Sequence, residues 1–275
     1  MGGDPGLAVM ATGLTQVPGV LAVVLGGSRG RGTDDVHSDV DLGLYYRPPL
    51  DLEALRAFAR EVAGPGAELA EPGAWGPWVD GGGWLTVDGQ AVDWIYRDLD
   101  RVHTAWADAR AGRFTLDFQV GHPFGVANTG YAGELALGRV LADPTGEMAR
   151  LQADTCTLPA ALRRTVVARA LFEIGFSLDT AAKAAARADT TYVSGCLFRV
   201  VTWCAYALHV AAGAWVSNEK GLVSACARLP DVPPDFVERA HDLLATAGRT
   251  SAELEGTLQA ARRLADEVGR VLPDA

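Results

Sequence analysis

The segment from residue 20 to residue 46 constrains the fold more than any other part of the chain. It begins with the apolar run VLAVVL, continues through a glycine-rich turn, and ends in the alternating stretch DVDLGLYY. A continuous run of β-branched and aliphatic residues is typical of a strand buried on both faces. The alternation that follows places Val40 and Leu42 on one face of a second strand, and Asp39 and Asp41 on the other. The segment therefore predicts two strands of a covered sheet.

The rest of the first half alternates between strand-like and helix-like patterns. Apolar spacing predicts helices at 7–15, 51–62, 99–111 and 130–141, and strands at 84–87 and 90–96. The dipeptide Asp88-Gly89, between the last two strands, is favoured in tight hairpin turns. Such a mixture of strands and helices predicts an α/β or α+β domain.

After about Thr145 the strand-like runs fade and alanine-rich periodic segments replace them. These segments predict helices at 159–188, 191–212, 218–229, 234–247 and 251–272. Successive helices joined by short turns are typical of a helix bundle. We therefore expect an α+β protein with two domains, a first domain at 1–145 with a mixed β-sheet flanked by helices, and an all-α bundle at 146–275.

The overall charge limits the classes of partner. The formal net charge is -10, which argues against binding long nucleic acids, because that requires a basic surface. A cationic small substrate or a divalent metal ion is compatible with this charge. The most apolar stretch, at 200–216, is interrupted by His209 and Gly213 and is too short to span a bilayer. With no leader-like N-terminus and four cysteines outside any CxxC pair, we expect a cytoplasmic protein without a membrane partner.

The two acidic residues of the second strand indicate chemistry. Asp39 and Asp41 are two positions apart, so their carboxylates share one face about 7 Å apart at the backbone. Two such charges repel each other by roughly 2 kcal/mol at an effective dielectric constant near 20. A divalent cation between them converts this repulsion into attraction, and carboxylate oxygens suit Mg²⁺.

Two further features belong to the same hypothesis. Glycines such as Gly27 let a backbone approach phosphate oxygens closely, and the following hydroxyl of Ser28 can bind them as well. Asp93 interrupts the apolar strand AVDWIY, where an ionised carboxylate is costly unless it is paired or binds metal. It is either a third metal ligand or a structural acid paired with Arg97 or Arg101.

The combination resembles the DNA polymerase β-like nucleotidyltransferase superfamily. The resemblance rests on the turn Gly27-Ser28, the pair Asp39 and Asp41 on the next strand, and the distal Asp93. An N-terminal domain of this kind followed by a helical bundle is similar to bacterial aminoglycoside-type and related small-molecule nucleotidyltransferases.

The resemblance implies a reaction and a set of residue roles. Enzymes of this type transfer a nucleoside monophosphate from a nucleoside triphosphate, such as ATP, to a hydroxyl of a small acceptor and release pyrophosphate. By position, the nucleotide-binding residues would be Gly27, Ser28, Arg31 and Ser38, and the metal ligands for two Mg²⁺ ions would be Asp39, Asp41 and Asp93. Asp93 would also take the proton of the acceptor hydroxyl.

Two of the implied roles have a plain structural alternative. Arg31 either binds the nucleotide or only braces the turn. Lys220, within the short motif Ser217-Asn218-Glu219-Lys220, either reaches the triphosphate or is an exposed lysine at the start of a helix.

Three functional hypotheses remain. The first is a magnesium-dependent nucleotidyltransferase whose acceptor is a small hydroxyl compound, such as an aminoglycoside-like antibiotic, and which would confer antibiotic resistance. The second keeps the chemistry but transfers AMP to a partner protein, as antitoxin-like nucleotidyltransferases do. The third is a non-catalytic nucleotide-binding protein, against which the presence of all three carboxylates argues.

Overall fold

The computed structural model describes residues 5–32 and 38–273. These residues form two compact units, each described below by itself. The first unit comprises residues 1–108 and 128–157, and the second comprises residues 109–127 and 158–275.

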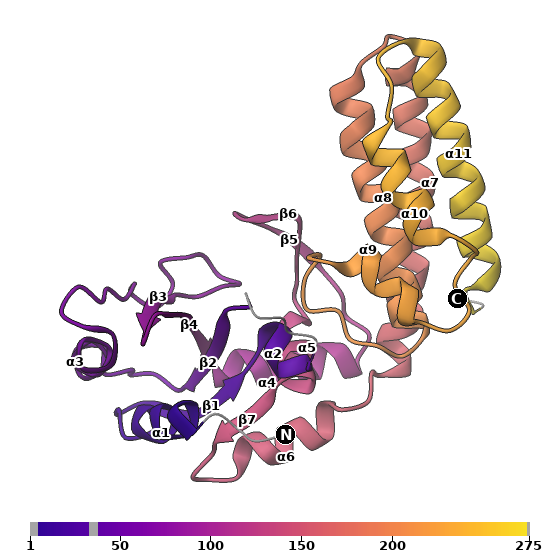
Figure 1. Ribbon diagram of the computed structural model, residues 1–275. Helices are drawn as coiled ribbons and strands as arrows, with labels where there is room; N and C mark the ends of the chain where they lie inside the picture. The colour runs from indigo at the N-terminus through magenta and orange to yellow at the C-terminus, as the bar shows by residue number, and fades with distance from the viewer. Residues whose placement is uncertain (1–4, 33–37, 274–275) are drawn as a thin grey trace. The chain divides into compact units, whose positions relative to one another are not determined.

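The first unit is built on a five-stranded mixed sheet (Figure 1). Its strands are β1 (Val20–Leu25), β2 (Val40–Tyr46), β3 (Gly82–Val87), β4 (Gln90–Asp98) and β7 (Arg139–Ala142). The strand order is β3-β4-β2-β1-β7, in which β2 and β4 are parallel and the other neighbours are antiparallel. The sheet and its helices confirm the α+β class.

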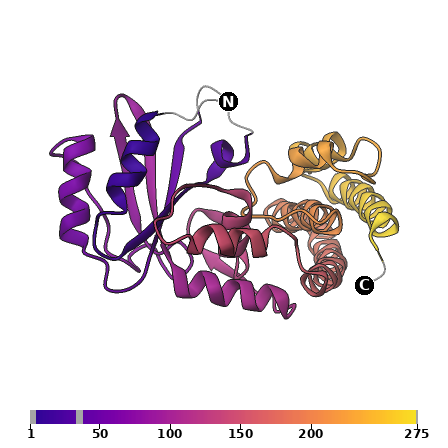
Figure 2. The same cartoon turned by 90° about the horizontal axis from the view of Figure 1, so that it is seen from below.

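One face of this sheet forms the hydrophobic core of the unit. Helices α1 (Pro5–Leu14) and α3 (Leu52–Ala63) lie on this side of the sheet (Figure 2). The helix α3 begins where the Asp51 side chain accepts a hydrogen bond from the backbone N–H of Ala54 at 2.9 Å, which is a typical N-cap. The alternate strand positions Leu42 and Trp94 are fully buried on this face, so their intervening neighbours lie on the other.

The opposite face is partly covered by α5 (Gly130–Leu137). Arg97 of β4 makes a two-pronged ion pair with Glu134 of α5, at 2.6 and 2.9 Å, and its guanidinium lies 4.9 Å from the centre of the Tyr131 ring. Burial lowers the pKa of Arg97, but the Glu134 carboxylate more than offsets this effect and the pKa is raised. The ion pair therefore fixes α5 against the sheet.

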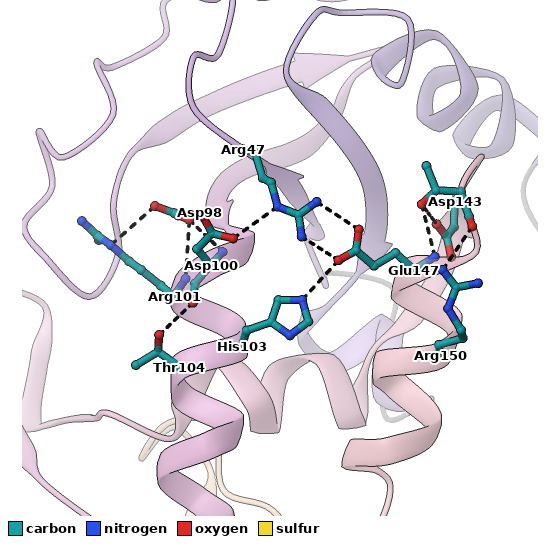
Figure 3. A network of polar contacts seen from close by, with 10 residues as sticks. Arg47, Asp98, Asp100, Arg101, His103, Thr104, Asp143, Glu147 and Arg150 are labelled. Carbon is teal, nitrogen blue, oxygen red and sulfur yellow. Dashed lines mark hydrogen bonds and ion pairs between the residues drawn. The ribbon is translucent and has the colours of Figure 1, made fainter.

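A polar network joins the end of β2 to α4 (Leu99–Arg110) and α6 (Glu147–Thr155) (Figure 3). Arg47 contacts Glu147 at 2.6 and 3.1 Å and Asp100 at 3.2 Å, and His103 lies 3.2 Å from the same Glu147 carboxylate. The hydrogen bond from Arg47 holds the pKa of Glu147 below its ordinary value, against the effect of burial.

The second unit is mainly helical, as expected for the C-terminal part of the chain. Its elements are the hairpin β5 (Leu116–Gln119) and β6 (His122–Ala127), the helices α7 (Ala160–Ala185), α8 (Thr190–Ala211), α9 (Leu222–Ala225), α10 (Phe236–Ala245) and α11 (Ser251–Val271), and a 3₁₀ turn at Cys226–Arg228. Within the described residues, only α8 is long and apolar enough to cross a membrane, and 72% of its apolar window is buried inside the protein.

The helix expected at 130–141 is wrong in its last third. The helix α5 ends at Leu137, and residues 139–142 form the edge strand β7 beside β1. At the junction, Gly138 packs so closely on β1 that a Cβ there would lie 2.6 Å from Cγ1 of Val24. Only glycine therefore fits at this position, and its extended backbone, with φ -80° and ψ 175°, ends the helix.

Other boundaries also differ from the expected ones. The strand expected to start at Asp39 starts at Val40, the helix expected at 218–229 is reduced to the short α9 and a 3₁₀ turn, and α6 was not predicted. The structure divides the chain differently from the expected boundary between 145 and 146. Residues 109–127 group with the helices because Phe124 packs on Trp203 and Tyr206 of α8, at ring-centre distances of 5.0 and 6.1 Å.

Candidate active site

The register of the parallel strands β2 and β4 places two of the predicted acids side by side. Asp41 is the direct partner of Asp93 in this parallel strand pair, so the two Cα atoms are about 4.8 Å apart and the side chains share one face. Both residues are intermediate in burial. At about 5 Å, two such carboxylates repel each other by about 3 kcal/mol at an effective dielectric constant near 20. The sheet therefore concentrates negative charge on its second face.

The glycine turn abuts the same carboxylate. The backbone N–H of Gly26 donates to the carbonyl oxygen of Asp41 at 2.8 Å. Gly27 has φ +58°, and a Cβ at this position would lie 2.7 Å from Cγ of Asp41 and closer still to Oδ2. Position 27 requires glycine for both its conformation and this close approach. The glycine turn is therefore packed directly against the Asp41 carboxylate.

Ser28 and Arg31 follow this turn in the short helix α2 (Gly27–Arg31). Ser28 is intermediate in burial and Arg31 is exposed. Gly32 ends the helix in the left-handed conformation, and its N–H donates to the carbonyl oxygen of Arg29 at 3.3 Å. The role of Ser28 and Arg31 in nucleotide binding stays a prediction.

Arg29 is a residue that the sequence did not single out. Its guanidinium donates two hydrogen bonds to the carbonyl oxygen of Ser38, at 3.0 and 2.8 Å. This clamp connects α2 to the entry of β2, directly before Asp39, which is exposed and precedes the strand by one residue. Arg29 therefore positions the backbone that carries Asp39. An arginine inside a glycine-rich turn is the only sequence signal for this contact, since a backbone acceptor leaves no trace in residue types.

The two arginines considered as ion-pair partners of Asp93 contact other carboxylates. Arg97 is held by Glu134. Arg101 lies 3.7 Å from Asp80 and 3.9 Å from Asp98.

The acids do not form a complete metal cluster in this structure. Within residues 5–32 and 38–273, no group of three or more His, Cys, Asp or Glu side chains is placed to hold a metal ion. The structure pairs two of the three predicted carboxylates, Asp41 and Asp93. Asp39 lies one residue before β2, the strand that carries Asp41. The donor set nevertheless fits Mg²⁺ in its chemistry, because it consists of hard carboxylate oxygens on adjacent strands.

The row of paired residues continues on β3. Trp84 is the direct partner of Asp93, and its side chain is 70% exposed. Trp84, Asp93 and Asp41 thus lie side by side across three neighbouring strands, on the face that carries the carboxylates.

Lys220 belongs to the second unit. It is exposed, in the loop before α9, and its backbone N–H donates to Oδ1 of Asn218 at 2.9 Å. Its predicted contact with a triphosphate stays a prediction.

Comparison with known proteins finds a family match over the first part of the chain. Residues 12–70 match the family described as "Nucleotidyltransferase domain", a segment that contains Gly27, Ser28, Asp39 and Asp41. No curated protein sequence matches the chain. The solved structure of a nucleotidyltransferase-like protein from Exiguobacterium sibiricum 255-15 is similar at 11% identity with a TM-score of 0.47, over 97% of this chain and 78% of that chain. The family match covers the segment that contains the glycine turn and two of the predicted carboxylates, and it supports nucleotidyl transfer as the activity of this protein.

Proposed function

We propose that the protein transfers a nucleoside monophosphate from a nucleoside triphosphate to a hydroxyl group of a small acceptor, in a magnesium-dependent reaction. The observation that carries this proposal is the registry that sets Asp93 beside Asp41, next to the glycine turn. The family match ends at residue 70, so the position of Asp93 supports the proposal independently of that match.

Each of the named residues has a defined task in this reaction. The backbone at Gly27 and the hydroxyl of Ser28 bind the triphosphate, and Arg31 adds a positive charge near it. Asp39, Asp41 and Asp93 would hold two Mg²⁺ ions. These ions would neutralise phosphate charge and make the attacking oxygen of the acceptor more nucleophilic. Asp93 accepts the proton of the acceptor hydroxyl.

The bond changes balance without any further reactant. The acceptor oxygen forms a bond to the α-phosphorus, the bond between the α-phosphorus and the oxygen bridging to the β-phosphorus breaks, and pyrophosphate leaves. The proton of the hydroxyl passes to Asp93 and from there to water. In-line transfer of this kind depends on positioning and charge neutralisation more than on covalent chemistry by the protein.

The acceptor class follows from charge. The protein has a net charge of -10, and the site itself is lined by carboxylates, so a cationic acceptor such as an aminoglycoside-like antibiotic is favoured over an anionic one. Resistance to such a compound would be the biological consequence.

Pyrophosphate release tests the proposal directly. Each of the four nucleoside triphosphates is incubated with the protein, Mg²⁺ and a panel of hydroxyl-bearing acceptors that includes aminoglycosides. We expect release with at least one pair and its loss in EDTA. The variants Asp41→Asn and Asp93→Asn should each lower the rate by about 10³-fold, since each removes a ligand of the charge-neutralising metal.

The matched control is Asp88→Asn, which makes the same change at an exposed acid of the β3–β4 turn. This variant should keep the wild-type rate. Equal rates in wild type, Asp41→Asn and Asp93→Asn would refute the proposal. Transfer of label from α-labelled ATP to a protein band in a cell lysate, with no labelled small molecule, would instead favour the protein-acceptor hypothesis.

A further inference from the structure

The two tryptophans beside the carboxylates form a stacked pair. The rings of Trp75 and Trp84 have centres 4.3 Å apart and planes inclined by 17°. Trp75 therefore covers one face of the Trp84 ring. The Trp84 side chain is still 70% exposed, so it presents a large area to solvent. Single exposed hydrophobic residues are common on protein surfaces. A stacked pair at the end of a row of carboxylates is a more specific arrangement.

The segment that carries Trp75 is anchored to the core. The backbone N–H of Trp75 donates to the carbonyl oxygen of Asp80 at 3.1 Å. Asp80 is 2% exposed, and its carboxylate accepts hydrogen bonds from the hydroxyl of Tyr46 at 2.9 Å and from the backbone N–H of Gly73 at 3.0 Å. The backbone that carries Trp75 is therefore fixed before any ligand binds, which lowers the entropic cost of binding.

The order of the row distinguishes the two ends of the site. Gly27 contacts Asp41, Asp41 is paired with Asp93, and Asp93 is paired with Trp84. The glycine turn at one end is the proposed place for the triphosphate. Trp84 lies at the other end, next to the carboxylate that would accept the proton of the acceptor hydroxyl. An aromatic surface at that end faces the acceptor side of the reaction.

We propose that Trp84, stacked on Trp75, is the platform on which a cationic, ring-bearing acceptor lies while its hydroxyl faces Asp93. This inference rests on the proposed nucleotidyl transfer and names the residue that selects the acceptor. The face of an indole ring attracts cations through its quadrupole, and the neighbouring Asp93 and Asp41 add negative charge. A protonated amino sugar combines the ring, the positive charge and the hydroxyl that this arrangement accommodates.

Equilibrium binding tests the platform without catalysis. Kanamycin serves as the cationic ring probe and maltotriose as a neutral sugar of similar size, each titrated calorimetrically into the nucleotide-free protein. Wild type should bind kanamycin more tightly than maltotriose. Trp84→Ala should weaken kanamycin binding by about tenfold, and Trp84→Phe by less, since an aromatic face remains.

The chain offers a matched control for loss of an exposed stacked ring. Phe172 of α7 is 62% exposed and stacks on Phe176 at 5.9 Å with an interplanar angle of 17°. Phe172→Ala should bind kanamycin as wild type does. Equal kanamycin affinity in wild type and Trp84→Ala, no binding of kanamycin to wild type, or equal affinity for the two sugars would overturn the proposal.

Steady-state kinetics separate this inference from the reaction on which it rests. Using the pair of substrates with the fastest pyrophosphate release, Trp84→Ala should raise KM for the acceptor about tenfold and leave KM for the nucleoside triphosphate unchanged. A raised KM for the nucleotide alone would assign Trp84 to the base instead and overturn the inference. Absence of pyrophosphate release under all conditions would refute the transfer reaction, whereas release with unchanged kinetics in Trp84→Ala would refute only the platform.

Discussion

The contact between Gly27 and Asp41 makes a sharp prediction for the variant Gly27→Ala. The new Cβ would lie 2.7 Å from Cγ of Asp41 and nearer still to Oδ2, whereas ordinary contact begins at 3.4 Å. The Asp41 carboxylate must therefore move by about 1 Å, because the backbone of the turn is fixed by the hydrogen bond from Gly26 to Asp41.

This displacement has separate consequences for activity and stability. A shift of about 1 Å in a positioned catalytic group lowers the rate by about 100-fold. The positive φ of +58° at position 27 also costs an alanine about 1–2 kcal/mol of folding free energy. We expect Gly27→Ala to fold, to unfold at slightly lower urea concentration, and to lose most of its pyrophosphate release.

The matched control is Gly32→Ala, at the end of the same short helix. Gly32 has φ +67°, and among residues 5–32 and 38–273 no atom lies within 4 Å of a Cβ built there. The backbone penalty should be the same, about 1–2 kcal/mol, but no carboxylate is displaced. The assay compares kcat and the urea midpoint of both variants. Equal loss of activity in the two variants would show that backbone strain, and not the position of Asp41, limits the reaction.

Two further predictions concern the parts of the first unit that hold the sheet. Glu134→Gln should lower the free energy of unfolding by about 2 kcal/mol, because it leaves the buried Arg97 guanidinium without its negative partner. The loss is not larger because Glu134 is partly solvated. An unchanged urea midpoint would contradict this prediction. The pKa of Glu147 is held below its ordinary 4.5 by Arg47 and, more weakly, His103, so its stabilising effect is complete above that pH and is lost as the pH falls through the lowered value. Wild type should therefore lose stability more steeply below pH 4.5 than Glu147→Gln, as thermal melts across that range would show.

Much of the first unit could be predicted from local patterns. The run VLAVVL is β1, and the Asp88-Gly89 turn joins β3 and β4 as expected. Alternation correctly assigned Val40 and Leu42 to one face, and both are fully buried. These features depend on residues near one another in the chain, which is why they can be read from sequence.

The missed elements depend on distant contacts. The strand β7 has four residues and exists because β1 offers an edge to pair with, a fact absent from its own sequence. The hairpin of β5 and β6 joins the second unit because Phe124 packs on Trp203. Short segments of this kind take their structure from their neighbours rather than from intrinsic propensity.

The candidate site shows the same division between local and distant information. Sequence spacing placed Asp39 and Asp41 next to each other, but their relation to Asp93 depended on whether β4 lies beside β2, which only the sheet order decides. The same order explains why the acceptor side could not be read from the sequence. Trp84 precedes Asp93 in the chain, yet the β3–β4 hairpin places it beyond Asp93 in the sheet. A search for acceptor residues confined to the C-terminal helices would have overlooked Trp84, since the β3–β4 hairpin places its side chain beside Asp93 in the first unit.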